Sequence, residues 1–455
     1  MNGLPLQELY VEDGDLKADM INIFLILLLN LLALWQSVLG ILQVCGIKAS
    51  GHARFALTGS FDNPGPYGGV IAVLCAILGA YVLLNRKNDS VVVKVLVTVS
   101  AISCALCAVV LPASMSRAAW LSLGVSAVVL GFREMHLKDW IKANRSLSIA
   151  ACAVVLVLLV GIFFLKKDSA IGRLHIWHME LRAIAEKPWT GHGKGTVLGV
   201  YGETQADYFA QKECPNIVER VAGCPEYAFN EYLRVGVEYG IPAMLSVVGL
   251  LMGAVILLLK IRSPFAYGLI AFCVFSFFSY PLSALRVRSA AEKEWESIRY
   301  LVTMEMYEDA IEELMPLRDE LDDNFRYLYD LGYSLHKVGR YNESDEVLRQ
   351  GSRFSSDPLF HVIMGKNHEA VGRYEDAEGE YRKAHHMVPG RIYPISLLMN
   401  LNIKTGDNAD AIRIGRKIKD MYVNEKVLTM RRLHTECLAR LDSLENLAES
   451  NRKYI

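Results

Sequence analysis

Ser116-Arg117 stands at one end of an uncharged, apolar stretch that runs from Ala118 to Phe132. If that stretch crosses a bilayer, the Arg117 guanidinium lies at or just inside the membrane edge. An ionisable side chain at such a depth is costly and commonly marks a functional site. Arg117 is therefore a candidate functional residue, and the alternative is a side chain that snorkels to lipid headgroups.

A second group of polar residues lies where a long polar loop runs into another apolar stretch. Asn230, Arg234 and Glu238 recur at the three- and four-residue spacing that puts side chains on one face of a helix. Such a face suits a helix that lines a water-filled cavity, and a solvated loop helix is the alternative.

Two segments rich in glycine and proline precede these residues in the sequence. Gly59–Gly69 contains Asn63-Pro64 next to an apolar stretch, which is typical of a backbone bend at a membrane edge or of a plain interhelical turn. Lys187–Gly195 lacks the Gly-Lys-Ser/Thr ending of a nucleotide-binding loop and follows no strand. We interpret this second run as the turn that ends the preceding helix.

That preceding helix begins near Gly172-Arg173. Leu174, Trp177, Leu181 and Ile184 follow at helical spacing. The pattern predicts an amphipathic helix that could lie on a membrane surface.

The elements that must position these residues are helices. Crossing a bilayer core takes roughly 20 apolar residues. Seven stretches without Asp, Glu, Lys or Arg reach or approach this length, namely Ile21–Val44, Gly68–Leu84, Val95–Met115, Ala118–Phe132, Ser146–Leu165, Ile241–Leu259 and Ser263–Leu285. The sequence thus predicts about seven membrane spans.

Basic residues in the short loops set the orientation of these spans. The loops after the second, fourth and sixth spans are rich in Lys and Arg, whereas the opposite short loops hold only Lys48, Arg54 and Arg117. Basic loops stay in the cytoplasm. The N-terminus is therefore expected inside, and the long loop 166–240 and the C-terminal region outside.

Charge divides the chain into two parts. From Ser289 to the C-terminus there are 24 Lys+Arg and 30 Asp+Glu, so this part carries −6 although the whole chain carries −1. The division excludes a single globular domain, a disordered chain and a basic nucleic-acid binder. It predicts a membrane domain, 1–288, followed by a soluble domain, 289–455.

The soluble part repeats itself. Tyr307-Glu308-Asp309-Ala310 and three related tetrapeptides, which begin at Tyr341, Tyr374 and Asn408, recur at spacings of 34, 33 and 34 residues. This is the period of the tetratricopeptide repeat, and small residues such as Gly332 recur in phase where paired helices touch. About 300–423 resembles such an array, so the expected fold is all-α: a polytopic helical membrane domain plus an α-solenoid. The solenoid would bind a protein partner or serve as a scaffold.

Five motifs in order resemble one enzyme superfamily. They read Gly-Ser-Phe-x-Asn-Pro, Ser-Arg, Gly-Arg-x-x-x-Trp, Pro-x-x-Gly-x-Gly and Asn-Glu-x-Leu-x-x-x-x-Glu-x-Gly, over about Leu57–Leu259. This order resembles the O-antigen ligase and O-antigen polymerase superfamily, which also includes bacterial protein O-oligosaccharyltransferases. Several members are similar in carrying C-terminal tetratricopeptide repeats.

The resemblance implies a GT-C-type enzyme of the bacterial inner membrane. Such an enzyme takes a glycan from a polyprenyl diphosphate carrier on the periplasmic face and passes it to a lipid, glycan or protein acceptor. It implies no cofactor and no metal. Whether the reaction is that of a ligase, a polymerase or a protein glycosyltransferase stays open.

The resemblance also assigns residues. Arg117 and Arg173 match the two arginines of the family and are the candidates for binding the diphosphate, because a guanidinium keeps its proton and binds phosphate bidentately. Asn63, Asn230 and Arg234 are expected in the substrate cavity.

Two departures from the family pattern bear on activity. Phe229 occupies the position of the proposed catalytic histidine, which leaves Glu231 and Glu238 as candidate bases if their pKa values suit the task. One span precedes the first motif where members usually have more, so the chain is a diverged member, a truncated one or half of a split pair.

Two cysteines share the exposed loop. Cys214 and Cys224 are separated by nine residues, and a disulfide between them is expected if the loop is periplasmic.

Two functions from different classes therefore remain. The first is a membrane glycan transferase. The second is a catalytically inactive, membrane-tethered repeat scaffold in a surface-glycan assembly complex. The two arginines favour the first, and Phe229 favours the second.

Overall fold

The computed structural model of the chain describes residues 6–151, 153–154, 157, 167–211, 216–282, 288–424 and 427–453. Every regular element in these ranges is helical, and helix makes up 77% of the structure. The expected all-α fold class is confirmed. The chain divides into two compact units, and each is described by itself.

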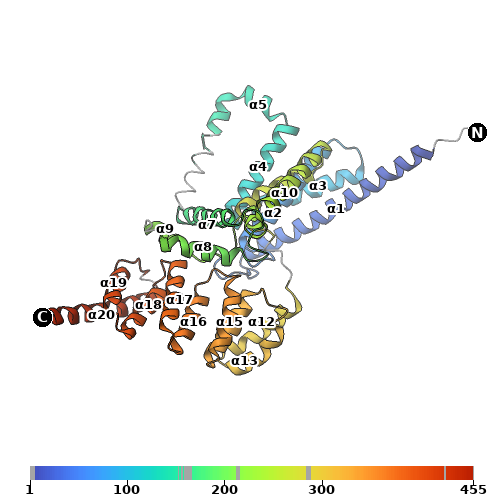
Figure 1. The fold of residues 1–455 in the computed structure, drawn as a ribbon. Coiled ribbons are helices and arrows are strands. Elements are labelled where there is room, and N and C mark those ends of the chain that lie inside the picture. Colours follow the sequence, from blue (N-terminus) through green and yellow to red (C-terminus); the bar gives the residue numbers. More distant parts are fainter. Residues whose placement is uncertain are drawn as a thin grey trace, which may run out of the picture. The chain divides into compact units, whose positions relative to one another are not determined.

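The first unit consists of Met1–Val160, Phe229–Tyr232 and Leu245–Leu285. Its helices are α1 (Leu6–Val44), α2 (Pro64–Asn85), α3 (Val91–Val110), α4 (Arg117–Glu134), α5 (Leu137–Ala143) and α11 (Phe265–Phe278), together with two parts of α10 (Glu231–Lys260) (Figure 1).

Helix α2 is central to this unit, since α1, α3, α4 and α11 all pack against it. Its side chains Tyr67, Ile71 and Leu78 are fully buried. The helix begins where the sequence favours a start: the Asn63 side chain accepts a hydrogen bond from the Gly65 N–H at 2.9 Å, and Pro64 takes the first helical position, where no N–H is needed. The first glycine-rich turn is thus a helix start.

Four described helices are long and apolar enough to cross a bilayer, namely Met20–Val44, Pro64–Asn85, Val91–Ser114 and Glu231–Lys260. They coincide with the first, second, third and sixth predicted spans. Large apolar side chains along them are exposed, for example Leu250 with 74% of its surface accessible. Exposed apolar surface of this extent is typical of helices that face lipid.

The other three predicted spans differ from this pattern, so the number seven stays a prediction. Helix α4 holds the fourth, and at Met135 and His136 the chain bends by 87° into α5. The seventh is shorter than its apolar sequence, because α11 ends at an extended Ser279. The fifth lies largely outside the described residues.

The second unit consists of Gly161–Ala228, Leu233–Met244 and Arg286–Ile455. The long loop contributes α7 (Lys167–Glu186), α8 (Val197–Gln211) and α9 (Asn216–Val221). The C-terminal region contributes α12 (Ala290–Thr303), α13 (Tyr307–Leu314), α14 (Phe325–Lys337), α15 (Tyr341–Ser352), α16 (Leu359–Ala370), α17 (Tyr374–Met387), α18 (Ile392–Thr405), α19 (Asn408–Lys419) and α20 (Leu428–Lys453). The loop packs with the C-terminal helices although they are far apart in the sequence, so the sequence alone did not predict this packing.

Helices α12 to α19 pair in sequence order and follow one another in a row, which we call the helix-pair array (Figure 1). Glycines sit where paired helices touch: an added Cβ on Gly332 would lie 2.6 Å from the Leu348 side chain, and one on Gly365 would lie 2.5 Å from the Tyr381 ring. This geometry explains the small residues in the 34-residue period. The tetratricopeptide assignment itself stays a prediction.

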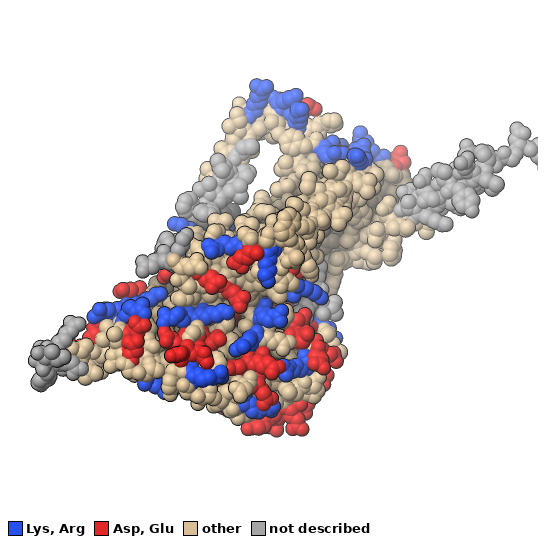
Figure 2. All heavy atoms as spheres, viewed as in Figure 1, with Lys and Arg blue, Asp and Glu red and all other residues tan. Residues whose placement is uncertain are grey.

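Charged side chains gather on the helix-pair array, where both signs are interspersed, whereas uncharged residues dominate the surface around α3 and α10 (Figure 2). This distribution agrees with the division of charge along the sequence. An apolar surface suits lipid, and a mixed-charge surface suits water.

Candidate functional site

The start of α2 and the turn before α4 come together in the first unit. A Cβ added to Gly68 would lie 2.7 Å from the Ser116 Cβ and 3.0 Å from the Ser114 Oγ. Only a residue without a side chain allows this approach. The glycine-rich start of α2 therefore packs against the Ser-Arg turn. Two motifs that are about 50 residues apart in the sequence thus lie in contact.

Arg117 is the first residue of α4 and is half-buried. Among the residues that the structure describes, none forms a hydrogen bond or an ion pair with its guanidinium. Ser116 does not cap the helix with its side chain, so the first N–H groups of α4 keep bonding capacity. A guanidinium beside a helix N-terminus is an arrangement that favours an anion.

Phe229, Asn230 and Glu231 belong to the same unit: Phe229 and Asn230 precede α10, and Glu231 is its first residue. Asn230 is buried, and its side chain accepts a hydrogen bond from the Tyr232 N–H at 3.0 Å, so it caps the helix. The buried Glu231 carboxylate accepts a hydrogen bond from the Leu282 N–H at 2.9 Å. Both side chains therefore have structural partners in addition to any role in binding substrate.

Tyr280 is a candidate that sequence reasoning missed. Its ring packs edge-on against Phe229 with centroids 5.4 Å apart, and its hydroxyl lies 3.8 Å from where a Cβ on Gly65 would be. Tyr280 thus connects the closing motif with the start of α2. Its only sequence signal is a tyrosine before Pro281 at the end of an apolar stretch.

Arg234 and Glu238 belong to the second unit and form an ion pair across one turn of α10, with N–O at 3.5 Å. The Glu238 side chain is 4% exposed and that of Arg234 25%. The expected shared helical face is present. Because each side chain neutralises the other, neither offers a full charge to a ligand.

The glycine-rich run Lys187–Gly195 packs on the backbone of α10 at a break in that helix. Gly240 has φ +83° and ψ 173°, and the next N–H, that of Ile241, donates to the Pro188 carbonyl at 2.7 Å. A Cβ on Gly191 would lie 2.4 Å from the Glu238 carbonyl carbon. The run is thus a turn after α7, as interpreted from the sequence, and it fixes the position of Glu238.

Arg173 is half-buried on α7, in the second unit. The acid nearest to it in the sequence, Asp168, pairs with Arg220 through two contacts of 3.1 Å. On the same helix Leu174 and Leu181 are largely exposed, whereas Ile184 is buried. The predicted apolar stripe is therefore split: its outer part is available to a membrane surface, and its inner end belongs to the core.

A buried polar cluster between α7 and α8 was not predicted. His175 contacts Gln205 at 2.8 Å through Nε2 and Oε1, and burial lowers the His175 pKa. Glu180 is 1% exposed, and burial raises its pKa well above the usual range. Its Oε2 accepts no hydrogen bond from the described residues. The sequence signal is an acid next to Met179 on the buried face of an amphipathic helix.

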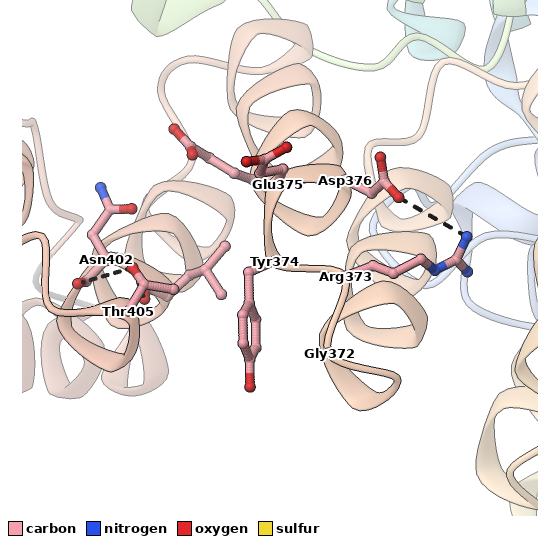
Figure 3. A pocket seen from close by; sticks show the side chains of 9 residues that line it. Gly372, Arg373, Tyr374, Glu375, Asp376, Asn402 and Thr405 are labelled. Carbon is pink, nitrogen blue, oxygen red and sulfur yellow. Dashed lines mark hydrogen bonds and ion pairs between the residues drawn. The ribbon is translucent and has the colours of Figure 1, made fainter.

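A hollow of about 560 Å³ lies on the helix-pair array, between α17 and α18. Figure 3 shows the side chains that line it. In it Arg373 points toward Asp376, with N–O at 3.9 Å. Two further carboxylates, those of Glu375 and Glu378, line the hollow. Net negative charge repels a diphosphate, and none of the motif residues lies here. We therefore do not assign the donor site to this hollow.

The predicted disulfide lies partly outside the described residues, because Cys214 is not among them. Cys224 is half-buried, and its Sγ lies 2.9 Å from the Arg391 guanidinium. Among the described residues, no cluster of His, Cys, Asp or Glu suits a metal ion.

Comparison with known proteins finds a family match over the part of the chain that holds most of the candidate site residues. The family model described as O-antigen ligase matches residues 102–248. This range includes Arg117, Arg173, Asn230 and Glu238, but not Asn63. No curated protein is similar enough to match. The match supports the O-antigen ligase superfamily and a membrane function in glycan transfer, and with the apolar helices it indicates a multi-pass membrane protein.

Proposed function

We propose that the chain transfers a saccharide from a polyprenyl diphosphate carrier to a lipid, glycan or protein acceptor at the periplasmic face of the bacterial inner membrane. The family match supports the class of reaction. The observation that carries the donor site is the half-buried Arg117 guanidinium at the start of α4, which no described residue pairs.

The reaction explains why arginines are needed. The bond between the anomeric carbon and the diphosphate oxygen breaks, and a bond to the acceptor hydroxyl oxygen forms. The hydroxyl proton goes to a base, and negative charge accumulates on the departing diphosphate. Arg117, and Arg173 on the loop, stabilise that charge. A hydrogen bond to a charged group contributes about 1.5–3 kcal/mol, or roughly one to two decades in rate for each arginine.

Glu231 and Glu238 are the two candidate bases. The Glu238 carboxylate lies 3.5 Å from the Arg234 guanidinium, so an ion pair already engages it. Glu231 accepts a backbone N–H. Phe229 beside it cannot move a proton, so the histidine of the family has no direct replacement at its own position. The proposal assigns no metal and no cofactor.

The test is glycan transfer in a strain that lacks the gene and carries each variant at matched membrane abundance. Arg117→Ala is expected to lower transfer at least tenfold, and Arg117→Lys to lower it also, because lysine loses the bidentate geometry. Arg133→Ala is the matched control: this arginine lies at the other end of α4, where it donates to the Leu259 carbonyl at 3.1 Å, and transfer should persist. Wild-type transfer by both Arg117→Ala and Arg173→Ala would remove the diphosphate site.

A second candidate function is an inactive scaffold in a surface-glycan assembly complex. The observations that favour it are Phe229 at the histidine position and the engagement of both glutamates by other protein groups. Under this function Glu231→Gln leaves glycan assembly unchanged, whereas loss of the helix-pair array abolishes it.

We further propose that the long loop and the helix-pair array lie in the periplasm and that the array consists of tetratricopeptide repeats. The Lys/Arg distribution in the short loops supports the first part. The 34-residue period and the glycine contacts between paired helices support the second.

A further inference from the structure

One face of α8, in the long loop, lies directly on the C-terminal ends of α15 and α17. A Cβ on Gly199 would lie 2.2 Å from the Arg353 carbonyl oxygen, a backbone atom that cannot rotate away as a side chain can. One on Gly202 would lie 2.7 Å from the Met387 Cε, the flexible end of a side chain, and 3.1 Å from the Ser356 Cα. The sequence of α8 is therefore fitted to this edge of the helix-pair array.

Gln205 joins three elements at the same contact. Its Nε2 donates to the Met387 carbonyl at the end of α17 and, at 3.1 Å, to the Gly223 carbonyl in the loop. Its Oε1 accepts a hydrogen bond from the Tyr201 hydroxyl and contacts His175 of α7 at 2.8 Å. Gln205 is 1% exposed, so these bonds lie in the interior. The side chain holds α7, α8 and α17 in one arrangement.

Polar contacts extend the interface toward the solvent. Ser356 Oγ donates to the Pro225 carbonyl at 3.0 Å, Arg326 pairs with Glu226 at 3.1 Å, and Lys383 pairs with Glu203 at 3.2 Å. Exposed ion pairs contribute little stability. The buried glycine face and Gln205 must therefore supply most of the specificity.

We propose that the helix-pair array holds the long loop of its own chain, and that Gln205 is a positioning residue for the proposed glycan transfer. This inference rests on the proposed function, because Arg173, Arg234 and Glu238 lie in the same unit as the docked helix. Met387 and Val388 pack against Ala206 of α8 and are buried. This edge of the array is thus occupied by the chain itself and does not serve as the docking surface for a separate protein.

The test compares two helical glycines in the full chain, purified from membranes. Gly199→Ala introduces the backbone clash, whereas Gly379→Ala on α17 meets open space and is the matched control. Hydrogen exchange followed by mass spectrometry should show faster exchange in 197–211 and 387–390 for Gly199→Ala only. Transfer should fall about tenfold to a hundredfold, since displacement of about 1 Å at a reacting centre can cost this much. Unchanged exchange in Gly199→Ala would overturn the docking.

A cross-link separates positioning from folding. The Cβ of a residue at position 202 would lie 3.5 Å from the Ser356 Cβ, which is within disulfide geometry. Gln205→Ala should lower kcat with little effect on KM, and the added pair G202C and S356C should restore kcat when oxidised and lose it again with reductant. Faster exchange in Gly199→Ala with wild-type transfer would overturn the positioning role. Exchange and cross-linking do not depend on transfer, so they decide the docking even if the wild-type chain transfers no glycan.

Discussion

Arg117 and Glu238 differ in what they can still bind. The guanidinium of Arg117 has no partner among the described residues, whereas the Glu238 carboxylate already faces Arg234 at 3.5 Å. Both residues were singled out in the sequence because of their type and spacing. Spacing placed Arg234 and Glu238 on one helical face correctly, but it did not distinguish a charge that awaits a ligand from one that is already neutralised.

Glu180 gives a pH-dependent prediction. A carboxyl whose pKa is raised by burial binds its proton more tightly in the folded protein than in the unfolded chain. Its stabilising contribution is complete below the ordinary glutamate pKa and is lost as the pH rises toward the raised pKa. Glu180→Gln stays neutral, so we expect a flatter dependence of Tm on pH between about pH 5 and pH 8 and a higher Tm than wild type at the upper end.

The measurement is thermal unfolding of the purified protein in detergent over that range of pH. Glu186→Gln is the control, because Glu186 is exposed on the same helix. Parallel pH profiles of Tm for wild type and Glu180→Gln would show that Glu180 is ionised in the fold and would contradict the prediction.

The cysteines of the long loop give a second prediction at this scale. Cys214 and Cys224 are expected to be bonded if the loop is periplasmic. Mass spectrometry of unreduced, alkylated peptides should find one peptide that contains both residues in linked form. Alkylation of both thiols would refute the pairing. Cys224→Ser is the control: it removes the sulfur atom that also contacts Arg391, so no linked peptide should form.

At the scale of the element, α10 performs two tasks because it is broken. Before Gly240 it carries Arg234 and Glu238, and after Gly240 it continues as an apolar helix to Lys260. The break is possible because glycine adopts φ +83° without strain. The turn after α7 fits against it, which explains why glycines occur in both segments.

Gly240→Ala is expected to destabilise this junction. A non-glycine residue at that φ costs about 1–3 kcal/mol, and the new Cβ would lie 2.6 Å from the Trp189 carbonyl oxygen. We expect a lower Tm and a loss of glycan transfer. Gly249→Ala on the same helix meets nothing within 4 Å and should behave as wild type. Equal Tm values for the two variants would argue against a role of the break.

At the scale of the whole molecule, charge and hydropathy divide the chain between lipid and water. Exposed apolar helices and a mixed-charge array occur in one polypeptide (Figure 2). The Lys/Arg distribution together with seven spans predicts that the array lies outside the cytoplasm.

A fusion of alkaline phosphatase after Ile455 tests this orientation, because the enzyme is active only where disulfides form. We expect an active fusion. The control is a fusion in the loop after the second span, near Lys87, which should be inactive because that loop is expected inside. An inactive phosphatase at Ile455 with an active cytoplasmic reporter at the same point would reverse the topology and imply an even number of spans.

The sequence by itself determined the helical class, the helical regions over 300–423, and four of the seven predicted spans that the structure shows as helices long enough to cross a membrane. These properties depend on hydropathy and on periods of about 3.6 and 34 residues, which are local patterns along the chain. It also placed Arg234 and Glu238 on one helical face and singled out Arg117 as a candidate, because their motifs are contiguous.

Only the tertiary structure decided which residues meet across long stretches of chain. The bond between Gln205 and Met387 joins positions 182 residues apart, and Tyr280 reaches both Phe229 and the start of α2. The burial of Glu180 likewise depends on how α7 and α8 pack. Such contacts follow from side-chain volume and backbone approach in three dimensions, and these have no periodic signature in a single sequence.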